Sequence, residues 1–195
     1  MSNSASANAQ VNGRAPLVRL YLVRGVLAVV WAVAFAHAHD TLGAAAITLL
    51  VAYPLLDAVS SAVDYLSVPD GPEQRVTAFN GALSTLVALG LGVAGSTHKV
   101  SAVLGVFGAW AVVSGAAQVA VGIRRRGPEL GRQWPMLVAG GLSTVAGVFY
   151  DIQAAGHEPS LDVLSVYATG GGVFFIVQAG LLVWKARRGV AQLRV

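Results

Sequence analysis

Six apolar stretches, each about 20 residues or longer, take up most of this sequence. A helix of about 20 apolar residues crosses roughly 30 Å of hydrocarbon. Lipid offers no hydrogen bonds to the backbone, so segments of this length in a bilayer form helices. The pattern therefore predicts an all-α integral membrane protein with six transmembrane helices. The stretches lie at 17–36, 42–66, 76–96, 100–123, 134–154 and 161–184.

The composition excludes several classes of protein. The chain is 55% hydrophobic and 11% charged, against about 25% charged in ordinary soluble domains. A soluble protein of 195 residues could not bury so much apolar surface. Cysteine is absent, which excludes a disulfide framework, thiol catalysis and thiolate metal sites.

The remaining residues form short links and two tails. Residues 1–16 are rich in Ser, Asn and Ala and predict a disordered cytoplasmic tail, followed by a transmembrane domain at 17–188 and a second tail at 189–195. The segment 20–33, with basic residues before it and Ala34-Phe35-Ala36 after it, also imitates a signal peptide with its cleavage site. We favour a retained helix, because this segment resembles the opening helix of two later repeats.

The basic residues indicate the orientation. Twelve of the thirteen Lys and Arg residues fall on one side of the predicted membrane, and the other side has only Lys99. Cytoplasmic loops carry the excess of basic residues in membrane proteins, so both termini are predicted in the cytoplasm. The run Arg124, Arg125 and Arg126 marks this boundary and is suited to anionic lipid head groups. Because the basic residues follow the topology, we do not predict nucleic-acid binding.

The predicted outer links hold every histidine of the chain. With neutral histidines the outer face has a formal charge of −3, and with all four protonated it has +1. Histidine changes charge between pH 5 and 8 more readily than other side chains, so one interpretation is a face that responds to external pH. The plainer interpretation, which we favour from sequence alone, is that short polar links tolerate histidine. The four residues are His37, His39, His98 and His157.

The chain repeats a two-helix unit three times, at about 17–68, 76–124 and 134–186. Gly81-Ala82-Leu83-Ser84-Thr85 matches Gly140-Gly141-Leu142-Ser143-Thr144, and Gln118 and Gln178 align before basic exits. Two helices return the chain to the same side, so the copies share one orientation and differ from inverted repeats. The sequence therefore predicts three parallel-related helical hairpins around an axis along the membrane normal.

These repeats resemble the HdeD-like acid-resistance membrane proteins. The matching residues are Arg24-Gly25-Val26-Leu27, the segment 110–115 with Gln118, and the segment 134–142, within a resemblance that covers about 17–188. The resemblance implies a bacterial inner-membrane protein of six helices, associated in some bacteria with survival in acid. It implies no catalytic residues.

Polar residues inside the spans are the other candidates for function, because charges in lipid are costly and usually face the bundle interior. Arg24 and Asp57 lie at similar predicted depths, which predicts an ion pair, and Asp64 is placed to meet Arg19 near the interface. One interpretation is a polar vestibule that binds a solute or relays a proton. The other, which we favour, is hydrogen-bonded packing between helices. The uncharged members are Asn80, Gln118 and Gln178.

No reaction is predicted. The histidines lack the spacing of a metalloenzyme motif, and we predict no catalytic residue, metal or cofactor. Three classes of function stay open: a protein of acid or envelope stress tolerance, a small-solute or proton-linked transporter that uses Asp57 and Arg24, and a structural scaffold. The expected surroundings are the lipid bilayer, with a second copy or another membrane protein as partner.

Overall fold

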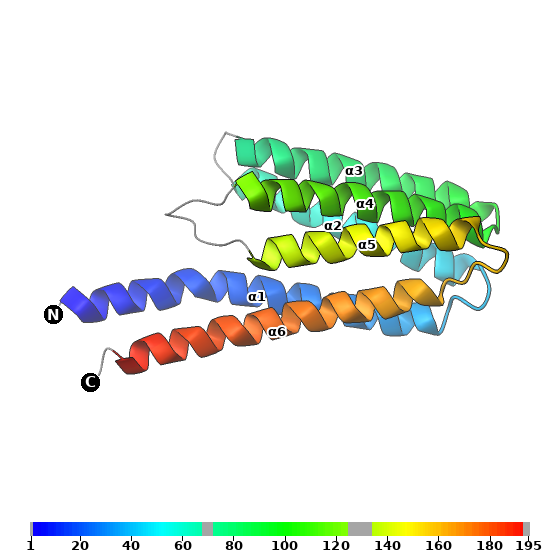
Figure 1. Ribbon diagram of the computed structural model, residues 1–195. Helices are drawn as coiled ribbons and strands as arrows, with labels where there is room; N and C mark the ends of the chain where they lie inside the picture. Colours follow the sequence, from blue (N-terminus) through cyan, green and yellow to red (C-terminus); the bar gives the residue numbers. More distant parts are fainter. Residues whose placement is uncertain (1, 68–71, 125–133, 193–195) are drawn as a thin grey trace. The chain divides into compact units, whose positions relative to one another are not determined.

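The computed structural model describes residues 2–67, 72–124 and 134–192, and its elements are all α-helices (Figure 1). Each helix lies over one of the predicted apolar stretches. Short links of polar and turn-forming residues separate α1 from α2, α3 from α4 and α5 from α6. The helices are α1 (Ser2–Ala36), α2 (Ala44–Ser67), α3 (Pro72–Ser96), α4 (Val100–Arg124), α5 (Trp134–Ala155) and α6 (Asp162–Gln192).

Five of these helices, α2 to α6, are long and apolar enough to cross a membrane, which confirms five of the six predicted spans. Within α1 the apolar part of the described residues is the shorter segment Tyr21–Ala36. Apart from the start of α1 and the end of α6, the helix bounds lie close to the ends of the apolar stretches, because a helix in lipid continues until water or a turn can satisfy its terminal backbone groups.

Both ends of the chain differ from the expected tails. Helix α1 begins at Ser2 and α6 continues to Gln192, where the sequence analysis expected disorder at 1–16 and a tail from 189. The N-terminal segment contains several alanines, which have the highest helix propensity. Extending an existing helix by one residue is also far less costly than starting a new one.

The chain divides into two compact units, which we describe separately. Unit 1 contains Met1–Val33 and Leu164–Val195, and unit 2 contains Ala34–Val163. In unit 1, α1 packs closely on α6: a Cβ atom added at Gly25 would lie 2.8 Å from the Gly172 carbonyl oxygen, and one at Gly172 would lie 2.8 Å from that of Gly25. The Tyr21 and Phe175 rings pack beside this crossing, 5.8 Å apart. Two glycines thus let the helix backbones approach.

In unit 2 the most extensive packing joins α4 to α5 and α2 to α3, with a smaller contact between α3 and α4. The predicted hairpin 76–124 lies inside this unit, yet its two helices pack less extensively than those two pairs. The reason lies in the glycines. Gly115 faces Gly140 and Gly108 faces Gly147, so α4 and α5 approach with main chain against main chain.

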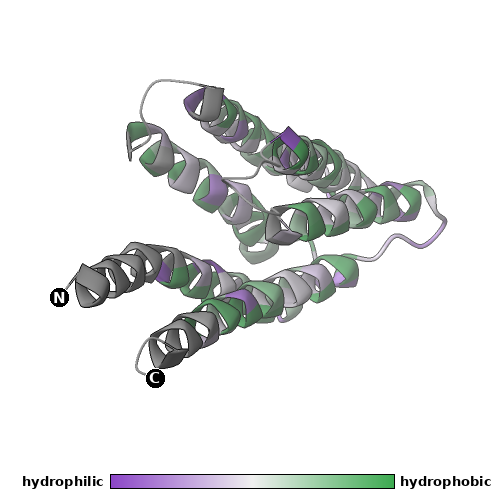
Figure 2. Ribbon diagram, turned by 60° about the vertical axis from the view of Figure 1, so that its left-hand side comes forward, coloured by the Kyte–Doolittle hydropathy of each residue, from purple (hydrophilic) through white to green (hydrophobic). Residues whose placement is uncertain are grey.

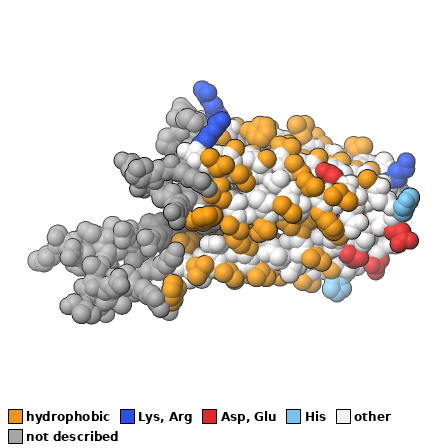
Figure 3. Space-filling model, in the orientation of Figure 1, with side chains coloured by type: hydrophobic (Ala, Val, Ile, Leu, Met, Phe, Trp, Pro, Cys, Tyr) orange, Lys and Arg blue, Asp and Glu red, His pale blue; other side chains and the backbone are white. Residues whose placement is uncertain are grey.

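The helices of unit 2 present apolar side chains outward. Val59, Leu86, Val93 and Val145 are each more than half exposed, and hydrophobic residues make up much of the helices (Figure 2). Figure 3 shows hydrophobic side chains over most of the visible face, with Asp, Glu and His mostly toward one end and Lys or Arg at both ends. An apolar surface between charged ends is what lipid requires of a protein that spans it.

Candidate functional site

The link between α1 and α2, residues 37–43, carries a group of polar contacts at one end of unit 2. His39 is only 13% exposed, and its Nε2 atom lies 2.9 Å from Oδ1 of Asp162 at the start of α6. Its Nδ1 atom lies 3.8 Å from Oδ1 of Asp40. The imidazole ring therefore has a carboxylate near each nitrogen.

Local structure holds both partners in place. The backbone N–H groups of Ala38 and His39 donate to the carbonyl of Phe35, which continues α1 as a turn and brings the His39 ring 5.6 Å from the Phe35 ring. The Ser160 hydroxyl donates to Oδ2 of Asp162 over 2.7 Å and accepts the Asp162 N–H over 3.2 Å. Ser160 thus orients Asp162 and satisfies a backbone donor at the start of α6.

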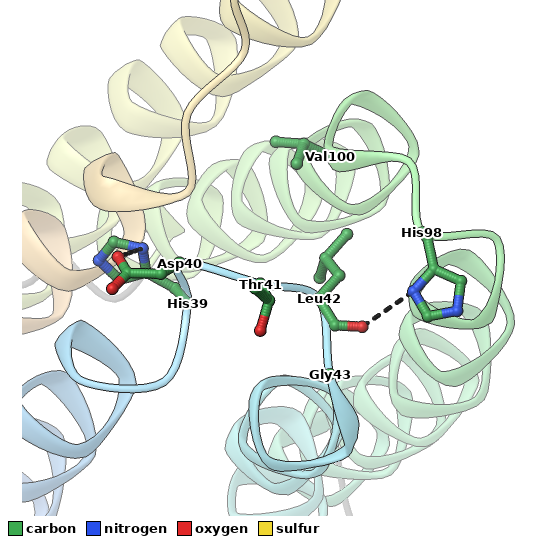
Figure 4. Close-up of a pocket in the computed structure, with 7 residues that line it drawn as sticks. All are labelled: His39, Asp40, Thr41, Leu42, Gly43, His98 and Val100. Carbon is green, nitrogen blue, oxygen red and sulfur yellow. Dashed lines mark hydrogen bonds and ion pairs between the residues drawn. The ribbon is translucent and has the colours of Figure 1, made fainter.

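His98 contacts the same link from the turn between α3 and α4. Its Nδ1 atom lies 3.0 Å from the carbonyl oxygen of Leu42 (Figure 4). The α1–α2 link, His98 and the start of α4 line an open hollow with a volume of about 420 Å³. The hollow is lined by His39, Asp40, Thr41, Leu42, Gly43, His98 and Val100.

The four predicted histidines therefore fall into two groups. His39 and His98 line one hollow, where His39 contacts Asp162 and His98 contacts the Leu42 carbonyl. His39 is partly buried, whereas His37, His98 and His157 are exposed. The sequence did not indicate the partner of His39, because Asp162 comes from a distant part of the chain. The only local signal was Ser160 two positions before Asp162, which is typical of a helix start.

A second polar cluster joins α2, α3 and α4 inside the predicted membrane region. Oδ2 of Asp57 accepts a hydrogen bond from Nδ2 of Asn80 and another from the Ser84 hydroxyl, each over 2.7 Å. Asn80 also donates to Ser61 over 2.9 Å, and the Trp110 indole N–H donates to Ser84 over 3.2 Å. Both serines are buried, so the cluster is a hydrogen-bonded contact between three helices.

The other predicted polar residues lie apart from this cluster. Gln118 on α4 contacts α5 near Gly140, and Gln178 is half-buried on α6 in unit 1. Arg24, also in unit 1, lies 5.7 Å from the centre of the Phe175 ring, a cation–π distance. Its pairing with Asp57 of unit 2 stays a prediction. The side chains of Asp64, Arg125 and Arg126 lie outside the described residues.

The hydroxyls of Thr85 and Thr144 donate to carbonyls four residues earlier on their own helices. Trp110 was not expected, because nothing in an apolar run distinguishes a tryptophan that donates a hydrogen bond from one that only packs. In the part of the chain that the structure describes, no three His, Asp or Glu side chains lie together as metal ligands.

Five apolar helices with lipid-compatible surfaces define a multi-pass membrane protein. Residues 97–150 match the family model described as a short repeat of unknown function, DUF308, a membrane-protein family that includes HdeD-like proteins. This match confirms the resemblance over that segment. It covers α4 and most of α5, the most extensively packed pair in unit 2. Searches among curated proteins and among solved structures gave no significant match.

Proposed function

We propose that this chain is a non-enzymatic inner-membrane protein that supports tolerance of acid at the cell envelope and responds to external pH through His39. The observation that carries the proposal is the His39 ring between Asp162 and Asp40. The family match at 97–150 supports the membrane setting.

The chemistry follows from the ring nitrogens. A neutral His39 donates one N–H to Asp162 and has no N–H for Asp40. A protonated ring donates from both nitrogens, so the contact with Asp162 becomes a charge-assisted hydrogen bond and Asp40 gains a cation beside it. Acid therefore strengthens the connection between the α1–α2 link and the start of α6. The gain lasts until the pH is low enough to protonate the carboxylates themselves.

Replacing His39 by Gln should remove a gain in stability on acidification. In lipid nanodiscs we expect the Tm difference between the natural protein and H39Q to grow by about 1–3 °C between pH 7.5 and 5.5. An exposed ion pair contributes about 1 kcal/mol or less, and that energy moves the Tm of a chain this size by a few degrees. The matched control is H157Q, since His157 is exposed in the α5–α6 link. If the Tm difference between the natural protein and H39Q is the same at pH 7.5 and at pH 5.5, the proposal is contradicted.

The cellular test is survival of a deletion strain after acid challenge, complemented with the natural gene, H39Q or H157Q. We expect the natural gene and H157Q to restore survival and H39Q to restore it incompletely, at equal amounts of protein in the membrane. A deletion strain that survives acid as well as its parent, under conditions where the protein is made, contradicts the acid role.

The proposal includes an orientation with both termini in the cytoplasm, supported by the distribution of the basic residues. The chain has no cysteine, so a single cysteine introduced at Glu158 or at Arg75 reports its own side. In intact spheroplasts a membrane-impermeant maleimide should label E158C and leave R75C unlabelled until the cells are opened. The reverse pattern contradicts the orientation.

Asp57 supports a second candidate, a small-solute or proton-linked transporter, because it is a half-buried carboxylate within an apolar helix. Flux of protons or solute into liposomes, lost in Asp57→Asn, would select this function. A protein with neither flux nor an acid phenotype would leave the third candidate, a membrane scaffold for a second copy or another partner.

A further inference from the structure

His98 occupies a backbone position that ordinarily belongs to glycine. Its φ angle is 55°, and the N–H groups of Thr97 and His98 donate to the carbonyls of Ala94 and Gly95 at the end of α3. A left-handed residue commonly follows a helix in this way, and glycine is preferred there because a Cβ atom makes the conformation costly. Histidine, with Asn and Asp, is one of the non-glycine residues found most often in this conformation, so the backbone tolerates it without requiring it. The side chain has to be explained by what it contacts.

That contact is the Leu42 carbonyl, 3.0 Å from His98 Nδ1. A carbonyl oxygen only accepts, so Nδ1 carries the hydrogen and Nε2 is the atom that can take up a second proton. Protonation of His98 thus keeps the hydrogen bond and makes it charge-assisted. Leu42 is itself buried and stands three residues after His39, at the other end of the same link.

We propose that His98 is a positioning residue for the acid-responsive pair: by holding the Leu42 carbonyl, it fixes the link on which His39 meets Asp162. This inference rests on the proposed function of His39. The link is then held from two sides, by the α3–α4 turn through His98 and by the start of α6 through Asp162. The other charged and titratable groups near His39 and His98 in the chain are His37 and Asp40 on the α1–α2 link, Lys99 in the α3–α4 turn and Asp162 at the start of α6. The α5–α6 link adds His157 and Glu158.

The test is a pH titration of ¹⁵N-histidine in the full chain in nanodiscs, where four histidines give four sets of signals. At pH 8 we expect His98 to carry its hydrogen on Nδ1, which the two nitrogen shifts report directly. In H98A, which lacks the donor, the titration midpoint of His39 should fall by roughly 0.2–0.7 pH unit, the scale of exposed charge pairs.

The conservative variant H98Q separates positioning from charge. Gln keeps an N–H donor for Leu42 without a titratable group, so it should restore the midpoint of His39. If His98 acted on His39 only through repulsion between two protonated rings, H98A and H98Q would both remove that repulsion. Both variants would then raise the titration midpoint of His39 by the same amount. An increase of the His39 midpoint in both variants would overturn the inference. So would an unchanged midpoint in H98A, and so would a neutral His98 with its hydrogen on Nε2. If the midpoints behave as expected while H39Q survives acid normally, the proposed function fails and the positioning role stands.

Discussion

Replacing Gly140 by alanine should destabilise the folded protein by about 3 kcal/mol, whereas the same change at the next residue, Gly141, should leave stability nearly unchanged. A Cβ atom at Gly140 would lie 2.7 Å from the Gly115 carbonyl oxygen and 2.9 Å from Cβ of Gln118. A Cβ atom at Gly141 would meet nothing within 4 Å. Main chain cannot rotate away as a side-chain tip can, so α4 and α5 would have to separate.

The measurement is thermal unfolding in nanodiscs, with size-exclusion chromatography to quantify the folded fraction. Helix α4 offers a second matched pair: G115A should behave like G140A, because its Cβ would lie 2.6 Å from the Gly140 carbonyl oxygen. G105A should behave like G141A, because Gly105 also faces open space. Equal Tm values for G140A and G141A would show that α4 and α5 do not cross at these glycines.

Replacing Asp57 by alanine should cost about 2 kcal/mol. The change removes the acceptor for Asn80 and Ser84, and the Ser84 side chain is fully buried. A buried donor without an acceptor costs about 1–3 kcal/mol, although hydrogen bonds between membrane helices average only about 0.6 kcal/mol. Asp57→Asn should cost less, because the amide keeps one acceptor oxygen.

Ser84 and Thr85 provide the matched control for this cluster. The Ser84 hydroxyl bridges Asp57 and Trp110, whereas the exposed Thr85 hydroxyl bonds only the Gly81 carbonyl of its own helix. S84A should therefore lower the Tm clearly more than T85A. Equal effects would mean that the cluster contributes little to stability. The same series tests the predicted ion pair, which is wrong if Asp57→Asn leaves stability unchanged while Arg24→Gln abolishes folding.

The positions of the helices could be predicted because length and hydropathy are local properties of the sequence. Helix pairing could not be predicted in the same way. Lipid is as apolar as a helix interior, so hydropathy does not distinguish a packed face from a lipid-facing one. Gly140 and Gly141 show the difficulty: they are adjacent and identical in the sequence, yet only Gly140 faces another helix.

The polar sites were predictable to different degrees. Asp57, Asn80 and Ser84 stand at similar depths on neighbouring helices, and depth can be counted along a helix at 1.5 Å per residue. The contact between His39 and Asp162 depends on how the link 37–43 turns back, which no periodicity records. The role of His98 was equally hidden, since a left-handed backbone and a carbonyl partner follow from the turn rather than from the residue type.

The packing of α1 on α6 has a consequence for how the chain is made. Helices α2 and α3, or α4 and α5, can associate as soon as the second member of each pair leaves the ribosome. The face of α1 around Gly25 can pack only after α6, which contains Gly172, has been synthesised. At about 5–20 residues per second, that delay is on the order of ten seconds. The packing of α1 on α6 is therefore expected to form only after α6 has been synthesised.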